Sequence, residues 1–363
     1  MRKTQCVALI GLACAGGGFA QVAGVGAAPV TGSSLTMFGV VDTAVAWGHG
    51  SLTHLTRVVS GGLNSSRLGF RSVENLGGGL GAGFWLESGV NSDDGSGGAS
   101  NTNNLASGAT VAGGLTFGRR STVSLISEWG ELRLGRDQTS IFRNRDQTDP
   151  FGTNGVGTMQ PQVGTIAGVT ATRASNMVIY LLPAQRLGGF FGEAEYYLGE
   201  QPSGSAGDGW QARLGYATKV WGLAGAYGRT NGEQTATTGN VKSWNVGAHW
   251  DFGVARLTGG YFEDKVERTA PLKGTGWLVG AVIPIGTNLF RLAYSTYGTD
   301  AAGDPKTKKV ALGYVHNLSK RTALYASYAH VNNSGPATTS LNGSTTDPGR
   351  NSDGVDLGLR HSF

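Results

Sequence analysis

The last nine residues of the chain, Val355-Asp356-Leu357-Gly358-Leu359-Arg360-His361-Ser362-Phe363, alternate between two kinds of side chain. The odd positions carry Val, Leu, Leu, His and Phe, whereas the even positions carry Asp, Gly, Arg and Ser. Successive side chains of a β-strand point to opposite faces, so this period of two predicts a strand with one apolar and one polar face. The chain therefore ends on an amphipathic strand.

The same period recurs along the chain from Leu35 onward. Residues 66–71 and 80–87 are clear examples, with Leu, Phe and Ala on one side of each segment. Sixteen segments show this pattern, and the sequence predicts strands at residues 35–47, 64–74, 80–91, 117–127, 131–138, 173–182, 188–199, 209–219, 223–230, 241–250, 254–267, 274–283, 288–298, 307–317, 321–332 and 353–363.

The connections between these segments are short and long by turns. The long ones are rich in Gly, Ser, Thr, Asn and Asp, and they include 92–116, 139–172, 200–208, 231–240, 299–306 and 333–352. Tight turns at one end of a set of hairpins and long loops at the other are typical of outer-membrane barrels. The sequence therefore predicts an all-β fold, a 16-stranded antiparallel transmembrane β-barrel with short periplasmic turns and long extracellular loops.

Composition supports a membrane barrel over the alternative, a soluble β-sandwich. Glycine makes up 62 of 363 residues, and only 15% of residues are charged, where soluble domains average about 25%. After the N-terminus no run of 18 apolar residues occurs, which excludes a bundle of membrane helices. A sandwich would expose charged faces, whereas the polar faces here carry mostly Gly, Ser and Thr, and the apolar faces end in aromatic residues.

The N-terminal segment has the features of a secretory signal peptide. Arg2 and Lys3 precede a short apolar stretch, and small residues allow cleavage after Ala20 or Ala28. We therefore assign residues 1–28 to the signal peptide and 29–363 to a single barrel domain. Both cysteines of the chain fall in the signal peptide, so the mature protein has no thiol chemistry.

Three blocks of sequence resemble one known family. Residues 34–42 look like the opening strand, residues 66–87 like the second hairpin, and residues 130–136 like the strand before the constriction loop of Gram-negative general diffusion porins. The resemblance covers essentially all of the mature chain. It implies a water-filled barrel in the outer membrane, a homotrimer, and a third loop, residues 139–172, that folds inward and narrows the channel.

The resemblance also implies which residues form the constriction. The family often carries Pro-Glu-Phe-Gly in the third loop, where this chain has Asp149-Pro150-Phe151-Gly152. The carboxylate is thus shifted by one residue and shortened. Asp149 is the expected acidic residue, with Asp146 beside it.

Arginines of the barrel wall are expected to face that loop. The resemblance selects Arg67, Arg136 and Arg173. The period of two agrees for Arg67 and sends Arg71 to the same face, but it points Arg133 inward and Arg136 outward. A bulge or strand end after Gly135 would reconcile the two expectations.

Together these features predict a passive channel for small hydrophilic solutes and ions. Guanidinium groups opposite carboxylates create a transverse field across a narrow aqueous gap, and the local excess of arginine suggests a weak anion preference. The expected partners are further copies of the chain, outer-membrane lipid and lipopolysaccharide, and the assembly machinery, for which Phe363 and its strand look like the recognition signal.

No motif for other chemistry was found. The six histidines show no metal-ligand spacing, and no P-loop, G-x-S-x-G or zinc-protease motif occurs. We expect no enzyme activity, no cofactor, no metal and no nucleic-acid binding. A substrate-specific porin, a surface adhesin and a barrel enzyme stay open as alternatives. For the first, Trp85 and Tyr325 make no clear aromatic row.

Overall fold

The fold was analysed in a computed structural model that describes residues 32–111, 113–159, 162 and 166–363. The predicted signal peptide, residues 1–28, lies outside the described residues. Among the described residues, no helix combines the length and apolar character that a membrane crossing requires.

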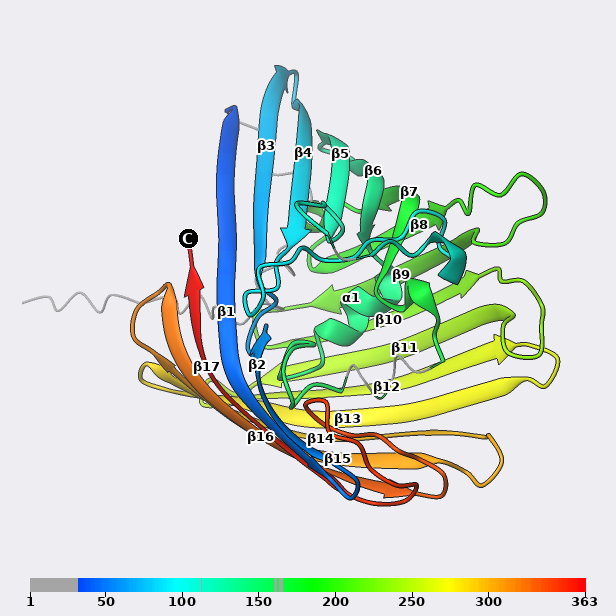
Figure 1. Ribbon diagram of the computed structural model, residues 1–363. Coiled ribbons are helices and arrows are strands. Elements are labelled where there is room, and N and C mark those ends of the chain that lie inside the picture. Colours follow the sequence, from blue (N-terminus) through cyan, green and yellow to red (C-terminus); the bar gives the residue numbers. More distant parts are fainter. Residues whose placement is uncertain (1–31, 112, 160–161, 163–165) are drawn as a thin grey trace, which may run out of the picture.

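The described residues form a single antiparallel sheet (Figure 1). A short helix, α1 (Ser140–Asp146), and three 3-10 turns, η1 (Ala106–Gly108), η2 (Val169–Ala171) and η3 (Ala184–Arg186), lie in its connections. The strands are β1 (Ser34–Gly50), β2 (His54–Ser60), β3 (Arg67–Gly77), β4 (Leu80–Gly89), β5 (Arg120–Ser127), β6 (Gly130–Gln138), β7 (Arg173–Leu181), β8 (Phe190–Tyr197), β9 (Gly209–Ala217), β10 (Trp221–Thr230), β11 (Asn240–Asp251), β12 (Arg256–Glu267), β13 (Leu272–Ile285), β14 (Asn288–Thr299), β15 (Lys306–Asn317), β16 (Thr322–Ser334) and β17 (Ser352–Ser362).

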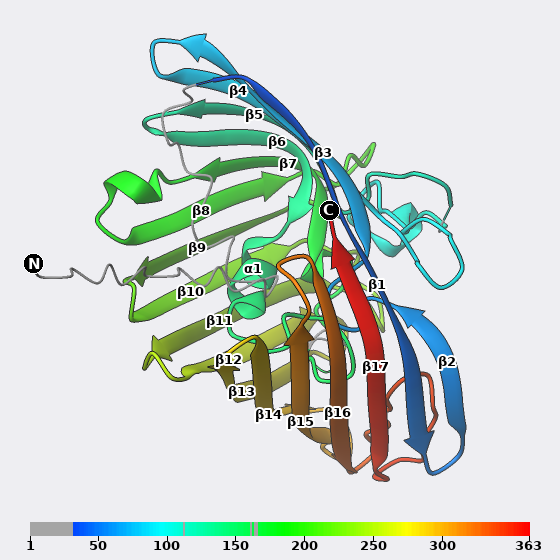
Figure 2. The ribbon, with the colours of Figure 1, turned by 90° about the vertical axis from the view of Figure 1, so that its left-hand side faces the viewer.

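The sheet closes on itself between the first and last strands. β1 pairs with β17 from Val40, opposite Ser362, to Gly50, opposite Ser352. Figure 2 shows the end of β17 beside β1, where the backbone N–H and C=O of Phe363 bond to Gly39, each at 3.1 Å. Closure leaves no open sheet edge to pair in the bilayer core, where water cannot satisfy backbone groups.

β2 and β3 both pair with β1 and occupy one position in the wall between β1 and β4. The seventeen strands of the described residues therefore make a 16-stranded barrel, which confirms the predicted fold. The sequence did not predict β2. It is a short run with exposed side chains, so it carries no buried face that a period of two could reveal.

The two faces of the wall differ as the alternation predicts. In β15, Val310, Leu312 and Tyr314 are exposed on the outside, whereas Thr307 and Lys309 are buried on the inside. Outward aromatic side chains gather near both ends of strands β8–β15. The ring contacts near the loops are Trp210–Tyr227, Trp244–Tyr261 and Trp277–Tyr294, and those near the short turns are Phe190–Tyr216, Tyr216–Trp221, Trp250–Phe252 and Phe290–Tyr314.

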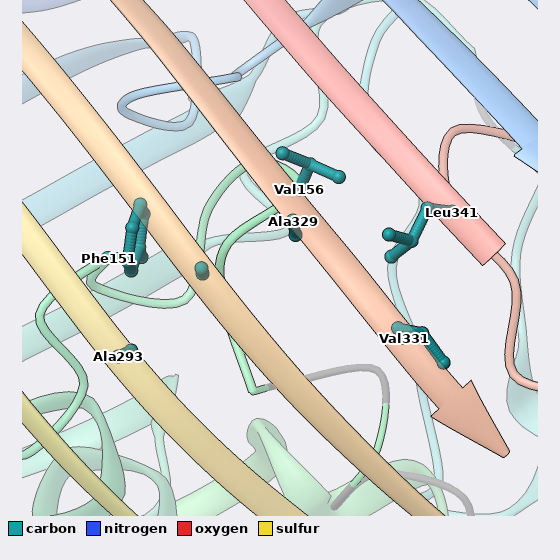
Figure 3. Close-up of a cluster of buried hydrophobic side chains, with 7 residues drawn as sticks. Phe151, Val156, Ala293, Ala329, Val331 and Leu341 are labelled. Carbon is teal, nitrogen blue, oxygen red and sulfur yellow. The ribbon is translucent and has the colours of Figure 1, made fainter. Parts of the chain in front are cut away.

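The loop between β6 and β7 runs inside the ring of strands, with α1 enclosed by the wall in both views (Figures 1 and 2). It is held against the far side of the barrel. The amide of Asn144 donates to Asn245 Oδ1 at 2.7 Å, and Val156 N donates to Asp356 Oδ2 at 2.7 Å. Figure 3 shows the apolar part of this seat, in which the loop residues Phe151 and Val156 pack with Ala293, Ala311, Ala329, Val331 and Leu341.

Wall glycines let the loop sit this deeply. A Cβ atom at Gly280 would lie 2.3 Å from Pro150 Cγ, and one at Gly247 would lie 2.1 Å from Thr148 Cγ2. Gly354 meets Val156 in the same way at 2.4 Å. These contacts leave no space for a methyl group, so the missing side chains form the trough that receives the loop.

Filling this trough should loosen the loop. In a Gly280→Ala variant, the new methyl group would displace Pro150, and overpacking of this kind costs about 1–3 kcal/mol. We expect a lower temperature of barrel unfolding, measured by circular dichroism and by heat-dependent gel mobility. Gly259→Ala is the matched control, because the nearest heavy atom to its added Cβ is 3.6 Å away. Equal unfolding temperatures for the two variants would contradict the trough.

Candidate functional site

A hollow of about 430 Å³ lies between the inward loop and the wall of strands β3–β7. The loop packs against the opposite wall, and the hollow is the space that remains between the loop and strands β3–β7. Its lining is mostly polar and comprises Phe38, Asn64, Ser65, Arg67, Trp85, Glu87, Arg119, Arg120, Asp137, Gln138, Phe142, Asp146, Gly152, Thr153, Asn154, Thr172 and Arg173.

The wall side of the hollow is cationic. Arg119 Nε lies 2.6 Å from Glu87 Oε1, and Arg67 Nε lies 3.7 Å from the same oxygen. Arg173 Nε donates to the backbone oxygen of Arg119 at 2.9 Å. The acceptor is a neutral carbonyl, so this hydrogen bond positions the guanidinium of Arg173 without neutralising its charge. Arg120 completes the group, and four guanidinium groups therefore line one side of a small aqueous space.

The loop side contributes one carboxylate, Asp146, at the end of α1. Thr153 Oγ1 donates to Asp146 Oδ1 at 2.9 Å. Burial is the main reason that the pKa of Asp146 is raised to about 6. The hydrogen bond from Thr153 opposes this rise, and the nearby carboxylate of Asp149 adds to it. The charge of Asp146 thus changes near neutral pH.

Aromatic rings support the arginines next to the hollow. The guanidinium of Arg120 lies 4.5 Å from the ring centroid of Trp85, and that of Arg71 lies 5.3 Å from it. Arg71 also lies 5.6 Å from the ring of Phe38. Stacking of this kind fixes a guanidinium in plane without neutralising its charge. Arg71 faces the inside, as expected, but it does not line the hollow itself.

Arg133 faces inward as the alternation predicts, but it is fully engaged in ion pairs. Its Nη1 lies 2.7 Å from Asp137 Oδ2 and its Nη2 lies 2.8 Å from Glu131 Oε1. Arg143 of α1 joins the same network, 2.8 Å from Asp137 and 2.5 Å from Glu193. These ion pairs attach α1 to the wall. Arg133 therefore holds the helix in position and does not line the hollow.

The structure corrects the expected position of Arg136. The pairing of β6 with β7 shifts between Gly135 and Asp137, and Gly135 has a φ of 125°. The extra residue lies in β7, so Asp137 keeps the inner face of Glu131 and Arg133, and Arg136 turns to the loop before β5. Its Nε donates to Gly118 O at 2.7 Å and its Nη1 to Ser175 Oγ at 2.9 Å. Arg136 therefore does not line the hollow.

Asp149 also differs from the expectation, because it faces the interior of its own loop. It is buried and accepts hydrogen bonds from Phe151 N, Thr158 Oγ1 and Met159 N at 2.8–2.9 Å. The shift of the carboxylate by one residue explains this. At position 149 it precedes the Pro-Phe-Gly turn and closes that turn, so Asp146 is the loop carboxylate that lines the hollow.

Sequence reasoning missed Arg119 and Arg120. The signal was present as two adjacent arginines after the long loop 92–116, but the strand was predicted to begin at residue 117. Strict alternation from there allows only one of the two to face inward. In the structure β5 begins at Arg120, so Arg119 belongs to the loop and both side chains reach the hollow. Elsewhere among the described residues, no group of His, Cys, Asp or Glu is arranged to hold a metal ion.

The inward loop depends on a buried cation of the wall. Lys309 Nζ donates to Val156 O at 3.3 Å and to Thr158 O. In a Lys309→Met variant, two loop carbonyls would lose this donor, and a buried polar group left without its partner costs about 1–3 kcal/mol. We expect a lower unfolding temperature and noisier open-channel current. Lys308→Met, one residue away but on the outer face, is the control, and equal behaviour of both variants would refute the anchor.

Comparison with known proteins agrees with this geometry. The model of the Gram-negative porin family matches residues 6–336. Outer membrane porin protein 32 of Delftia acidovorans is 35% identical, and the alignment covers 99% of this chain and 100% of that protein. The solved anion-selective porin from Comamonas acidovorans is 32% identical, with a TM-score of 0.81 over 91% of this chain and 100% of that one.

A more distant structure shares the fold. OmpT of Vibrio cholerae, in a trimer form, is 13% identical, with a TM-score of 0.66 over 92% of this chain and 100% of its own. The family match spans most of the chain. The closed 16-stranded barrel with its internal polar hollow agrees with that match. The chain belongs to the Gram-negative porin family and is an outer-membrane porin that forms a channel for passive diffusion.

Proposed function

We propose that this porin favours small hydrophilic anions and that its constriction is the arginine-lined hollow. The observation that carries the proposal is the placement of Arg67, Arg119, Arg120 and Arg173 on one side of a space to which the described part of the loop contributes a single carboxylate, Asp146. The name of the Comamonas relative, an anion-selective porin, is consistent with it.

The charges of the hollow do not cancel. Glu87 is paired with Arg119 and Arg67, and Asp137 is paired with Arg120, Arg133 and Arg143. Four guanidinium groups therefore share three lining carboxylates. A guanidinium is charged at every physiological pH and offers several donors to a carboxylate or phosphate oxygen. A passing anion can exchange water for these donors, whereas a cation finds two of the three carboxylates, Glu87 and Asp137, already paired with arginines.

We further propose that the barrel works as a homotrimer. Among the described residues, most outward ring contacts lie on β8–β15, whereas β17 and β3–β6 have none and β1 has the Trp47–His49 pair near the loops. Smaller outward residues such as Val41, Val45 and Leu125 cover that side. An apolar face with few outward aromatic contacts suits contact with another barrel better than contact with lipid headgroups. We propose in addition that Phe363, at the barrel seam, serves as the assembly signal.

Neutralising one arginine should weaken anion preference. A unit charge about 10 Å from the ion path in water is worth about 0.4 kcal/mol, or about twofold in relative permeability. We expect the reversal potential of an Arg173→Gln channel, recorded in a planar bilayer under a dilute salt gradient, to move toward zero. The shift should correspond to about a twofold fall in the anion-to-cation permeability ratio. Arg229→Gln, on the outer face, should leave it unchanged. The difference should shrink near 1 M salt, where screening is strong. A wild-type reversal potential that favours cations would overturn the proposed anion preference. In the same recordings, channels that close in three equal steps would support the trimer.

Anion preference should fall as pH rises through about 6. Below that pH Asp146 is protonated and neutral, since its pKa is raised to about 6, and above it the carboxylate adds a negative charge to the hollow. Permeability ratios measured at pH 5 and pH 7.5 should differ by about twofold, the value of one charge at this range. Asp146→Asn should hold the pH 5 ratio throughout, and Asp94→Asn, in an outer loop, should behave as wild type. A pH step that persists in Asp146→Asn would show that another group titrates.

A further inference from the structure

The loop between β4 and β5 is fastened to the barrel wall at β7 by an asparagine-rich turn, residues 101–105. In this turn Asn101 Oδ1 accepts a hydrogen bond from Asn104 N at 2.7 Å, and Asn101 Nδ2 donates to Leu105 O at 2.8 Å. Asn104 has a φ of 61° and is 2% exposed. Asparagine tolerates this left-handed conformation better than most residues. The turn therefore holds a buried amide, and a buried amide needs hydrogen-bond partners.

The Asn104 amide finds these partners on the backbone at the end of β7. β7 pairs with β8 only from Met177, opposite Tyr197, onward, so Ser175 precedes that pairing. Asn104 Oδ1 accepts from Ser175 N at 2.7 Å, and Asn104 Nδ2 donates to Ser175 O at 3.1 Å and to Leu198 O at 3.0 Å. The two bonds to Ser175 reproduce the reciprocal pair of an antiparallel ladder. The side chain thus stands in for a neighbouring strand, and we call it the Asn104 clip.

Ser175 links the clip to Arg136. Arg136 Nη1 donates to Ser175 Oγ at 2.9 Å, and the same hydroxyl donates to Asn101 O. Arg136 Nε donates to Gly118 O at 2.7 Å. The guanidinium therefore joins β7 to the chain just before β5, because its planar fork reaches both acceptors at once.

The chain just before β5 carries one of the arginines that line the hollow. Arg119 N donates to Glu87 O at 3.1 Å, and Arg119 O accepts the hydrogen bond of Arg173 at 2.9 Å. Together with the bond from Arg136 to Gly118, these contacts position the backbone of Arg119. A displacement of this backbone would move the guanidinium of Arg119 and release that of Arg173.

We propose that Asn104 is a positioning residue for ion selectivity, and that it acts through Ser175 and Arg136 on Arg119 and Arg173. The inference rests on the proposed anion preference of the hollow. Neither Asn104 nor Arg136 lines the hollow, so neither touches an ion that passes there. The clip holds the turn and Ser175 together, and this keeps Arg136 in the geometry that fixes the chain before β5.

A neutral substitution tests the clip without changing any charge. Asn104→Gly removes the amide, and glycine adopts a φ of 61° without strain. We expect its reversal potential, recorded in a planar bilayer under a dilute salt gradient, to correspond to about a twofold lower anion-to-cation permeability ratio, about the effect of one unit charge near the ion path. Asn103→Gly is the matched control, because the side chain of Asn103 bonds within the loop, to Leu105 and Ser107.

The route through Arg136 is tested by a second variant. Arg136→Lys keeps the charge but loses the fork that reaches Ser175 and Gly118 together. It should lower the permeability ratio about as much as Asn104→Gly, and the double variant should lower it no further, because both changes break one network. Additive effects would overturn the proposed route. Ser175→Ala, which removes the shared hydroxyl and no charge, takes the place of Asn104→Gly if that variant does not fold.

Loosening of the loop is measured separately, by the mobility of a spin label on Ala106→Cys at an exposed position of η1. Asn104→Gly should mobilise the label and Asn103→Gly should not. The proposal fails if the label in Asn104→Gly stays immobile, if the reversal potential is unchanged, or if Asn103→Gly shows an equal shift. The sign of the wild-type potential tests the anion preference itself, whereas the difference between variant and wild type tests the clip, so the two proposals can fail separately.

Discussion

The structure depends on the need to pair every backbone N–H and C=O group in a medium without water. In a bilayer a sheet meets this need only when its first and last strands join, and β1 and β17 do so over eleven residue pairs. Closure then dictates the alternation of side chains, because one face of every strand meets lipid and the other meets the aqueous interior. The low charge content and the period of two are consequences of this one requirement.

Closure also explains why the wall could be predicted and the interior could not. The wall imposes its period on each strand separately, so local sequence was enough for sixteen strand positions. The irregular pairing at Gly135 depends on the extra residue of β7 opposite it, and it does not bring Arg136 into the hollow as the predicted bulge would have done. The burial of Asp149 depends on donors up to ten residues away, and the joint position of Arg119 and Arg120 depends on where the loop before β5 ends. None of these interior features follows a repeat in the sequence from which it could have been predicted.

Arginine residues of the interior fall into two groups that sequence cannot separate. Arg133 and Arg143 are locked in buried pairs with Asp137, Glu131 and Glu193, which attach α1 to the wall. A buried pair gains little net energy over an apolar contact, but breaking one is costly, so these pairs fix the loop position more than they stabilise the barrel. Arg173 has its guanidinium held by a neutral carbonyl, which leaves its charge for the channel.

The same distinction between compensated and uncompensated charge organises the outer face. A wall in lipid has few means to satisfy a cation, and the porin places its outward lysines where strands leave the hydrocarbon. Inside, carboxylates of the chain itself neutralise most arginines, and the excess is small and local. Outside, Glu267 and Glu263 offset Lys242 and Lys273, whereas Lys265 and Lys308 have no carboxylate within 4 Å among the described residues. In the channel, the charge that the fold leaves unpaired is the charge available to a mobile anion.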